Sequence, residues 1–154
     1  MLKLISSLNT LPFGEVVDIY SEYQGNPWSM NQVQDFYAYL KEDFFPNNGV
    51  YALWEDEGIY KSAVRLVPWE NGILLTGLET KRQDRNRGYA KALLYAVAEY
   101  VEKDRGGVLY SHVSKDNTAS IATHRTCGFV VLSENAKLLD GSVLSDHYTL
   151  RLSH

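Results

Sequence analysis

Apolar positions along the chain change spacing several times, and each spacing predicts a type of secondary structure. Runs rich in β-branched and aromatic residues predict strands at residues 2–5, 50–54, 59–67, 73–80, 108–113, 129–132 and 143–152. Apolar residues at helical spacing predict helices at residues 13 to about 24, 29 to about 43, 91–102 and 117 to about 126. A strand–helix–strand unit after an antiparallel meander predicts a mixed α/β sheet, with strands 73–80 and 108–113 parallel.

The central stretch of the chain is a predicted strand, a basic loop and a helix. The helix places Leu93, Leu94, Val97, Ala98 and Val101 on one face. A loop with one glycine that opens a helix exposes backbone N–H groups at the positive end of the helix dipole, where a phosphate can bind. The loop therefore predicts a phosphate site made by Arg85, Asn86, Arg87, Gly88, Tyr89, Ala90 and Lys91.

A solvated basic loop without a ligand is the alternative interpretation of this stretch. The loop lacks the two further glycines of a dinucleotide-binding fingerprint, and it lacks the Gly-Lys-Ser/Thr of a nucleotide P-loop. The neighbouring elements must therefore decide between a ligand site and a simple connection.

Composition restricts the class of protein. The chain has 154 residues, which suits a single domain at residues 1–154. Its net charge of −4 argues against a nucleic-acid partner, because neutralising phosphates requires an excess of Lys and Arg. The single cysteine excludes an internal disulfide and suits a reducing cytoplasm. Neither a signal peptide nor an apolar run near the roughly 20 residues of a membrane span is evident, so no membrane partner is expected.

Two separated motifs carry a resemblance to a known family. Residues Arg85 to Ala90 match a pattern of Gln or Arg, two residues, Gly, one residue, and Gly or Ala, at a strand-to-helix junction. A second segment begins at Asn117, 29 residues after Gly88, and leads to Gly128-Phe129. In this order and context, the two motifs resemble those of the GCN5-related N-acetyltransferase (GNAT) family, over about residues 50–152.

The resemblance implies a fold and a cofactor. The fold is a mixed sheet of about six to seven strands flanked by about four helices, with residues 50–152 as the cofactor-binding core and 1–49 as a helical segment that varies with the acceptor. The cofactor is acetyl-CoA, whose pyrophosphate would bind the amides of about Asn86 to Ala90. Its pantetheine arm would lie along Leu78, Glu79 and Thr80 and near Asn117 and Ser120. A simple helix N-cap is the alternative for Asn117.

Acyl transfer to an amine requires a proton acceptor, and Glu79 stands at the end of the central strand, where it can serve. A solvated strand-end glutamate is the alternative. Where the family often has a tyrosine as acid, four residues before the glycine of Gly-Phe, this chain has His124. His124 is therefore a candidate acid, or a histidine that hydrogen-bonds the helix. Cys127 is expected to fill the core, and the histidines show no metal-ligand spacing, so no metal is expected.

The sequence thus predicts a cytoplasmic N-acetyltransferase that transfers an acetyl group from acetyl-CoA to a primary amine of a small molecule or peptide. A non-catalytic acyl-CoA-binding sensor or interaction module is the alternative. The protein is expected to be a monomer or homodimer. Aromatic residues on the acceptor side, joined by carboxylates that attract a cationic amine, are expected to form its pocket; core packing is the alternative for these aromatic residues. The candidates are Tyr20, Tyr23, Trp28 and Trp54, with Glu22, Asp56 and Glu79.

Overall fold

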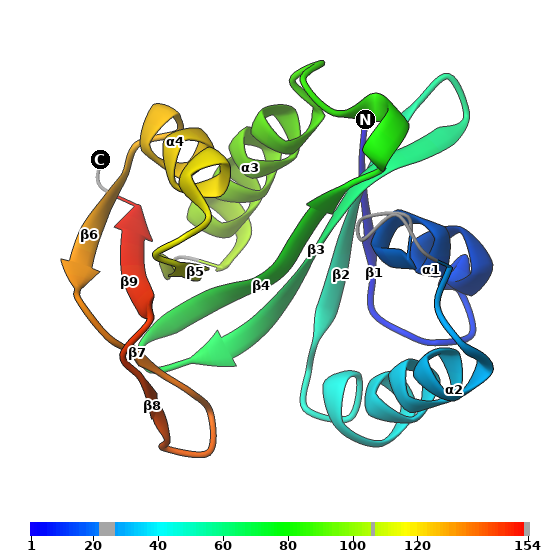
Figure 1. Ribbon diagram of the computed structural model, residues 1–154, viewed down its shortest axis with the longest axis horizontal. Coiled ribbons are helices and arrows are strands. Elements are labelled where there is room, and N and C mark those ends of the chain that lie inside the picture. Colours follow the sequence, from blue (N-terminus) through cyan, green and yellow to red (C-terminus); the bar gives the residue numbers. More distant parts are fainter. Residues whose placement is uncertain (22–26, 106, 153–154) are drawn as a thin grey trace.

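The computed structural model describes residues 1–21, 27–105 and 107–152, and its main feature is a seven-stranded mixed sheet (Figure 1). The order across the sheet is β1-β2-β3-β4-β5-β9-β6. Neighbouring strands are antiparallel except β4 and β5, which are parallel as predicted. The predicted α/β fold class is confirmed. The strands are β1 (Leu2–Ile5), β2 (Val50–Asp56), β3 (Ile59–Trp69), β4 (Gly72–Thr80), β5 (Val108–Ser114), β6 (Phe129–Ser133) and β9 (His147–Leu152).

Helices cover both faces of the sheet. In Figure 1, α1 (Phe13–Ser21) and α2 (Met30–Tyr39) lie on one side of β3 and β4, and α3 (Tyr89–Tyr100) and α4 (Thr118–Thr126) lie on the other. Short π-helical segments, Leu40–Phe44 and Val101–Arg105, extend α2 and α3. Within the described ranges, no helix combines the length and apolar character needed to cross a membrane.

The start of α2 is fixed by its sequence. The Ser29 hydroxyl accepts a hydrogen bond from the Gln32 backbone N–H, and the Gln32 side chain accepts one from the Ser29 N–H, at 3.2 and 2.8 Å. This reciprocal pair satisfies two backbone donors that a helix start leaves without partners. The predicted N-cap at Ser29 is confirmed. The predicted end of the first helix, near residue 24, lies outside the described residues.

Two hydrophobic clusters lie on opposite faces of the sheet. The alternation of side chains along each strand sends neighbouring residues to different faces, so β3 contributes Val64 and Leu66 to one cluster and Ala63 and Val67 to the other. The first cluster packs beneath α3 and α4 and includes Leu93, Leu94, Val97, Val101, Cys127 and Phe129. The second packs beneath α1 and α2 and includes Val16, Ile19, Tyr20, Leu40, Phe44 and Tyr51.

One predicted strand is wrong. The sequence predicted a single strand over residues 143–152, but Val143–Leu144 forms β8, which pairs with β7 (Ala136–Lys137) in a separate two-stranded sheet. The chain then turns at Ser145 and Asp146 before β9 begins. Ser and Asp favour turns because their short polar side chains compete with regular backbone hydrogen bonding. Because Val143 and Leu144 are apolar, the sequence pattern suggested one continuous strand across this turn.

Two irregularities of β4 create the site. In the β3–β4 ladder Ala63 pairs with Glu79 and Arg65 pairs with Thr76, so Gly77 and Leu78 together oppose one β3 residue and form a β-bulge. On its other side, β4 pairs with β5 only over Gly72–Leu75. Beyond Leu75, no described strand pairs with this edge of β4, and its backbone is available to an extended ligand.

Candidate functional site

A cavity of about 600 Å³ lies where the end of β4, the loop before α3, the first turn of α3 and the start of α4 meet. Every predicted cofactor-binding residue except Arg87 lines it. Asp84, Ala119 and Thr123 also line it, and the sequence reasoning missed them. Thr123 stands three residues after Ser120, and this helical spacing could have identified it; Ala119 stands one residue from Ser120 and two from Asn117, so spacing gave no signal for it. The lining residues are Leu78, Glu79, Thr80, Asp84, Arg85, Asn86, Gly88, Tyr89, Ala90, Lys91, Asn117, Ala119, Ser120 and Thr123.

The first turn of α3 presents backbone donors to this cavity. Gly88 is the N-cap residue, has φ of 83°, and makes no side-chain cap to the helix. The first intrahelical bond runs from the Ala92 N–H to the Gly88 carbonyl, at 2.9 Å. The preceding N–H groups therefore lack helical acceptors. A Cβ placed on Gly88 would meet no atom within 4 Å, so the space in front of these donors is open. An anionic group fits there.

Arg85 and Lys91 add positive charge to the cavity wall, whereas Arg87 does not line the cavity. The Arg87 side chain is exposed, and its Nη1 lies 3.6 Å from Oδ1 of Asp84. The sequence placed Arg87 among the ligand residues on its spacing alone. Its observed contact is with a carboxylate of the same loop.

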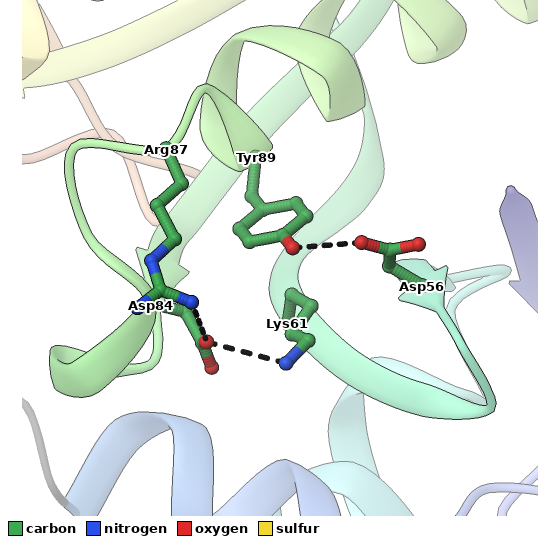
Figure 2. A network of polar contacts seen from close by, with 5 residues as sticks. All are labelled: Asp56, Lys61, Asp84, Arg87 and Tyr89. Carbon is green, nitrogen blue, oxygen red and sulfur yellow. Dashed lines mark hydrogen bonds and ion pairs between the residues drawn. The ribbon is translucent and has the colours of Figure 1, made fainter.

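Asp84 connects the loop before α3 to the sheet. Its Oδ1 also lies 3.2 Å from Nζ of Lys61, a residue of β3, and both side chains are largely buried (Figure 2). The other carboxylate oxygen, Oδ2, is buried and has no hydrogen-bond partner among the described residues. Asp84 is also one of the residues that line the cavity.

A second contact fixes the start of α3. The Tyr89 hydroxyl donates a hydrogen bond of 2.7 Å to Oδ2 of Asp56, at the end of β2 (Figure 2). The Lys61 ammonium lies 5.8 Å from the centroid of the Tyr89 ring, within cation–π range. Asp56, which the sequence reasoning placed on the acceptor side, is thus engaged at the α3 start instead.

Glu79 is a suitable proton acceptor. Burial raises the pKa of its carboxyl to about 7, while the positive charge of Arg85 acts in the opposite direction. A carboxyl with a pKa near neutrality is ionised in part at physiological pH and holds a proton more firmly than an exposed one. Glu79 pairs with Ala63 of β3 and belongs to the end of β4 beyond Leu75, where the other edge of the strand pairs with no described strand.

Asn117 caps α4 and also lines the cavity. Its side-chain oxygen accepts a hydrogen bond of 3.0 Å from the Ser120 N–H. The N-cap expected from the sequence is confirmed, and the side-chain amide NH₂ provides further donors. Its contact with a ligand remains a prediction.

His124 does not line the cavity and is buried. Its Nδ1 lies 2.7 Å from the Ser120 carbonyl oxygen, which can only accept, so Nδ1 carries the proton. Its Nε2 then accepts from the Ser111 hydroxyl, 2.9 Å away. Burial lowers the pKa of this imidazole, which favours the neutral ring. The arrangement suits a structural histidine and does not favour the acid role that the resemblance implied.

The aromatic residues that the sequence placed in the acceptor pocket lie on both faces of the sheet. Tyr20, Trp28 and Phe36 pack together on the α1–α2 face, with the rings of Tyr20 and Trp28 stacked at 6.2 Å. Trp54 packs against the cluster on the opposite face. Tyr23 and Glu22 lie outside the described residues. Cys127 is buried in the core, as expected, and burial raises the pKa of its thiol.

Comparison with family models now decides the class. The model of the acetyltransferase (GNAT) family matches residues 13–129, which is most of the chain. The chain belongs to the GNAT family. The cavity at the α3 start coincides with the motif that suggested this family from the sequence. No curated protein matches the sequence.

Solved GNAT structures share the fold over nearly the whole chain. The ribosomal-protein-S18-alanine N-acetyltransferase from Escherichia coli has a TM-score of 0.67 and 19% identity, with 99% of this chain and 93% of that chain covered. PaiA N-acetyltransferase from Thermoplasma acidophilum, solved in complex with coenzyme A, has a TM-score of 0.65 and 15% identity, with 100% and 99% covered. A GNAT acetyltransferase from Staphylococcus aureus has a TM-score of 0.71 and 13% identity, with 99% and 100% covered.

Proposed function

We propose that the protein is an acetyl-CoA-dependent N-acetyltransferase that acetylates a primary amine of a small molecule or peptide. The observation that carries the proposal is the cavity itself. It joins an uncapped helix N-terminus, suited to phosphate, to the unpaired edge of β4, where Glu79 has a pKa of about 7. No other described part of the chain combines an anion site with a proton acceptor of this kind.

The residues of the cavity fit coenzyme A. Backbone donors of the first α3 turn, with Arg85 and Lys91, would hold the pyrophosphate. The free edge of β4 from Thr76 to Thr80 offers backbone groups to the amides of the pantetheine arm. The solved complex of the PaiA enzyme with coenzyme A supports the choice of cofactor.

The chain's own residues then manage the protons and charge of the reaction. When bound, acetyl-CoA supplies a thioester carbonyl carbon to which the amine nitrogen bonds as the carbon–sulfur bond breaks. Glu79 accepts the proton that the amine must lose, directly or through one water. A backbone N–H of the bulge near Leu78 would stabilise the carbonyl oxygen as it gains charge. No described side chain near the cavity is required as an acid, since a thiolate leaves readily.

The solved neighbours support an amine as acceptor, because the Escherichia coli enzyme is named for acetylation of the alanine of ribosomal protein S18. We further propose a cytoplasmic location, in line with a single cysteine that is buried in the core. The monomeric or homodimeric state remains part of the proposal.

The proposal is tested in two steps. Acetyl-CoA should raise the melting temperature, because a ligand that binds only the folded state stabilises it. A thiol-release screen across primary amines should then show acceptor-dependent release of coenzyme A. Binding without release for any amine would favour the non-catalytic acyl-CoA-binding module, and absence of binding would exclude both.

A further inference from the structure

Arg65, a residue of β3, is enclosed by aromatic rings on the α1–α2 face of the sheet. Its guanidinium carbon lies 5.6 to 5.9 Å from four ring centroids. Rings at this distance stabilise a cation through their quadrupoles, but they provide no opposite charge. The rings belong to Tyr20, Phe36, Tyr39 and Tyr51.

The charge of Arg65 is not balanced within the described residues. Nη1 of its guanidinium donates a hydrogen bond of 3.1 Å to the Tyr51 hydroxyl, and the Tyr39 hydroxyl interacts with the guanidinium as well. Its Nε is buried and has no hydrogen-bond partner among the described residues, and none of the ion pairs among their side chains includes Arg65. Burial raises the pKa values of Tyr20, Tyr39 and Tyr51, so these phenols are neutral. Arg65 is only partly exposed, and a cation that is partly removed from water without an anion nearby is costly. A planar guanidinium suits a carboxylate.

The guanidinium lies at the reactive end of β4. A Cβ placed on Gly77 would come within 2.6 Å of Nη2 of Arg65, so the tip of the side chain lies against this residue of the bulge. Gly77 itself is exposed, which leaves a path from solvent to this place. A side chain here would fill the space that the arginine occupies.

Arg65 and Glu79 also share one face of the sheet. Glu79 pairs with Ala63, and Ala63 and Arg65 are two residues apart on β3, so all three side chains belong to the same face. Tyr20 connects the two charged groups, because Arg65 lies over its ring and the Glu79 charge acts on its hydroxyl. A cation and a proton acceptor therefore belong to the same face of the sheet, the one opposite α3 and α4.

We propose that the acceptor is an amine that also carries a carboxylate, with the carboxylate bound by Arg65 and the amine directed toward Glu79. The inference rests on the proposed acetyltransferase function and specifies its substrate class. It adds a carboxylate to the cationic amine expected from the sequence, because the Arg65 charge attracts an anionic group. The surrounding rings would cover the apolar part of such a substrate.

Amino acids and their amides provide the test. Glycine, L-alanine, L-methionine and β-alanine are each paired with the primary amide, and kcat/KM is measured by coenzyme A release. The parent enzyme should prefer the free acids by about tenfold or more, which corresponds to about 1.4 kcal/mol. Arg65→Met should abolish that preference, and Arg65→Lys should keep part of it, because Lys retains the charge without the planar fork. The melting temperature and acetyl-CoA affinity of each variant serve as controls for folding.

Binding provides a readout that does not depend on turnover. Calorimetry on the protein saturated with coenzyme A should show tighter binding of the N-acetyl amino acids than of their N-acetyl amides, and Arg65→Met should remove the difference. If Arg65→Met does not fold, the parent ratio and the partial loss in Arg65→Lys decide the question. Transfer to uncharged or cationic amines without preference for the acids would overturn this inference and leave the proposed function intact. Neither transfer nor product binding with any probe would overturn both.

Discussion

The hydroxyl of Tyr20 donates a hydrogen bond of 2.6 Å to the main-chain carbonyl of Gly77. This contact joins helix α1 to the bulge of β4, two elements that are far apart in the sequence. Tyr20→Phe should lower the free energy of unfolding by about 1 kcal/mol, because the carbonyl loses its protein partner. Urea denaturation measures the loss. Tyr37→Phe, at an exposed position of α2, is the matched control and should leave stability nearly unchanged; equal values for both variants would contradict the prediction.

The open space in front of Gly88 allows a direct test of the proposed phosphate site. Gly88→Glu should abolish acetyl-CoA binding, since a carboxylate would occupy the place of the pyrophosphate. Gly58→Glu is the matched control, because Gly58 also has positive φ with open space around it but belongs to the β2–β3 turn. Both variants should lose about 1–2 kcal/mol of stability from the left-handed backbone. Calorimetric binding that is normal in a folded Gly88→Glu variant would refute the site.

Glu79 should give the reaction its pH dependence. With a pKa of about 7, the carboxylate form increases as pH rises through neutrality, and turnover should rise with it. Glu79→Gln should lower turnover about 10²-fold at neutral pH and leave acetyl-CoA binding nearly intact. The measurement is a pH–rate profile for both proteins. Identical profiles would remove Glu79 from the mechanism.

The same pKa shift predicts the effect of Glu79 on stability. The folded protein holds this proton more tightly than the unfolded chain, whose glutamate titrates near 4.5. The free energy of unfolding should therefore decrease as pH rises from about 4.5 to about 7, and this contribution should be absent in Glu79→Gln. Urea denaturation of both proteins at several pH values compares the slopes.

The ion pair of Lys61 and Asp84 should contribute more to stability than its N–O distance of 3.2 Å suggests. The side chains are only 14% and 4% exposed, so Lys61→Met leaves a buried carboxylate with reduced compensation and should cost about 3 kcal/mol or more. The pair of Lys103 and Glu99 is shorter, at 2.6 Å, but its side chains are 69% and 65% exposed. Lys103→Met should hardly change stability because solvent screens that pair. Equal losses of the free energy of unfolding for both variants, measured by urea denaturation, would show that burial does not determine how much these ion pairs contribute.

His124 should contribute to stability and not to proton transfer. Because burial lowers the pKa of the imidazole, the stabilisation by its neutral form is complete above about pH 6.5 and is lost as pH falls. His124→Gln should therefore lose stability most at high pH, while the shape of the pH–rate profile stays that of the parent. A change in that profile, with acetyl-CoA binding preserved, would restore His124 as a candidate acid.

Local spacing made most of the cavity predictable. The loop around Gly88, the strand before it and the cap at Asn117 are short segments whose chemistry depends on near neighbours in the sequence. Arg65 was not predictable in the same way, because the rings around it come from three elements, α1, α2 and β2. The contacts of Asp56 and His124 could not be derived from local spacing for a similar reason: their partners, Tyr89 and Ser111, belong to other elements. The sequence signal for the β-bulge was limited to one glycine, Gly77.

The bulge at Gly77 and Leu78 makes the face on which Glu79 lies sensitive to the length of β4. Side chains alternate along a regular strand, and Ile73 and Leu75 belong to the cluster beneath α3. Without the extra residue, Glu79 would follow that odd-numbered series and belong to the α3 face; with it, Glu79 pairs with Ala63 and belongs to the opposite face. A deletion of one residue here would preserve the strand yet exchange the sides on which the carboxylate and Thr80 stand. One inserted amino acid thus decides on which face of the sheet Glu79 lies.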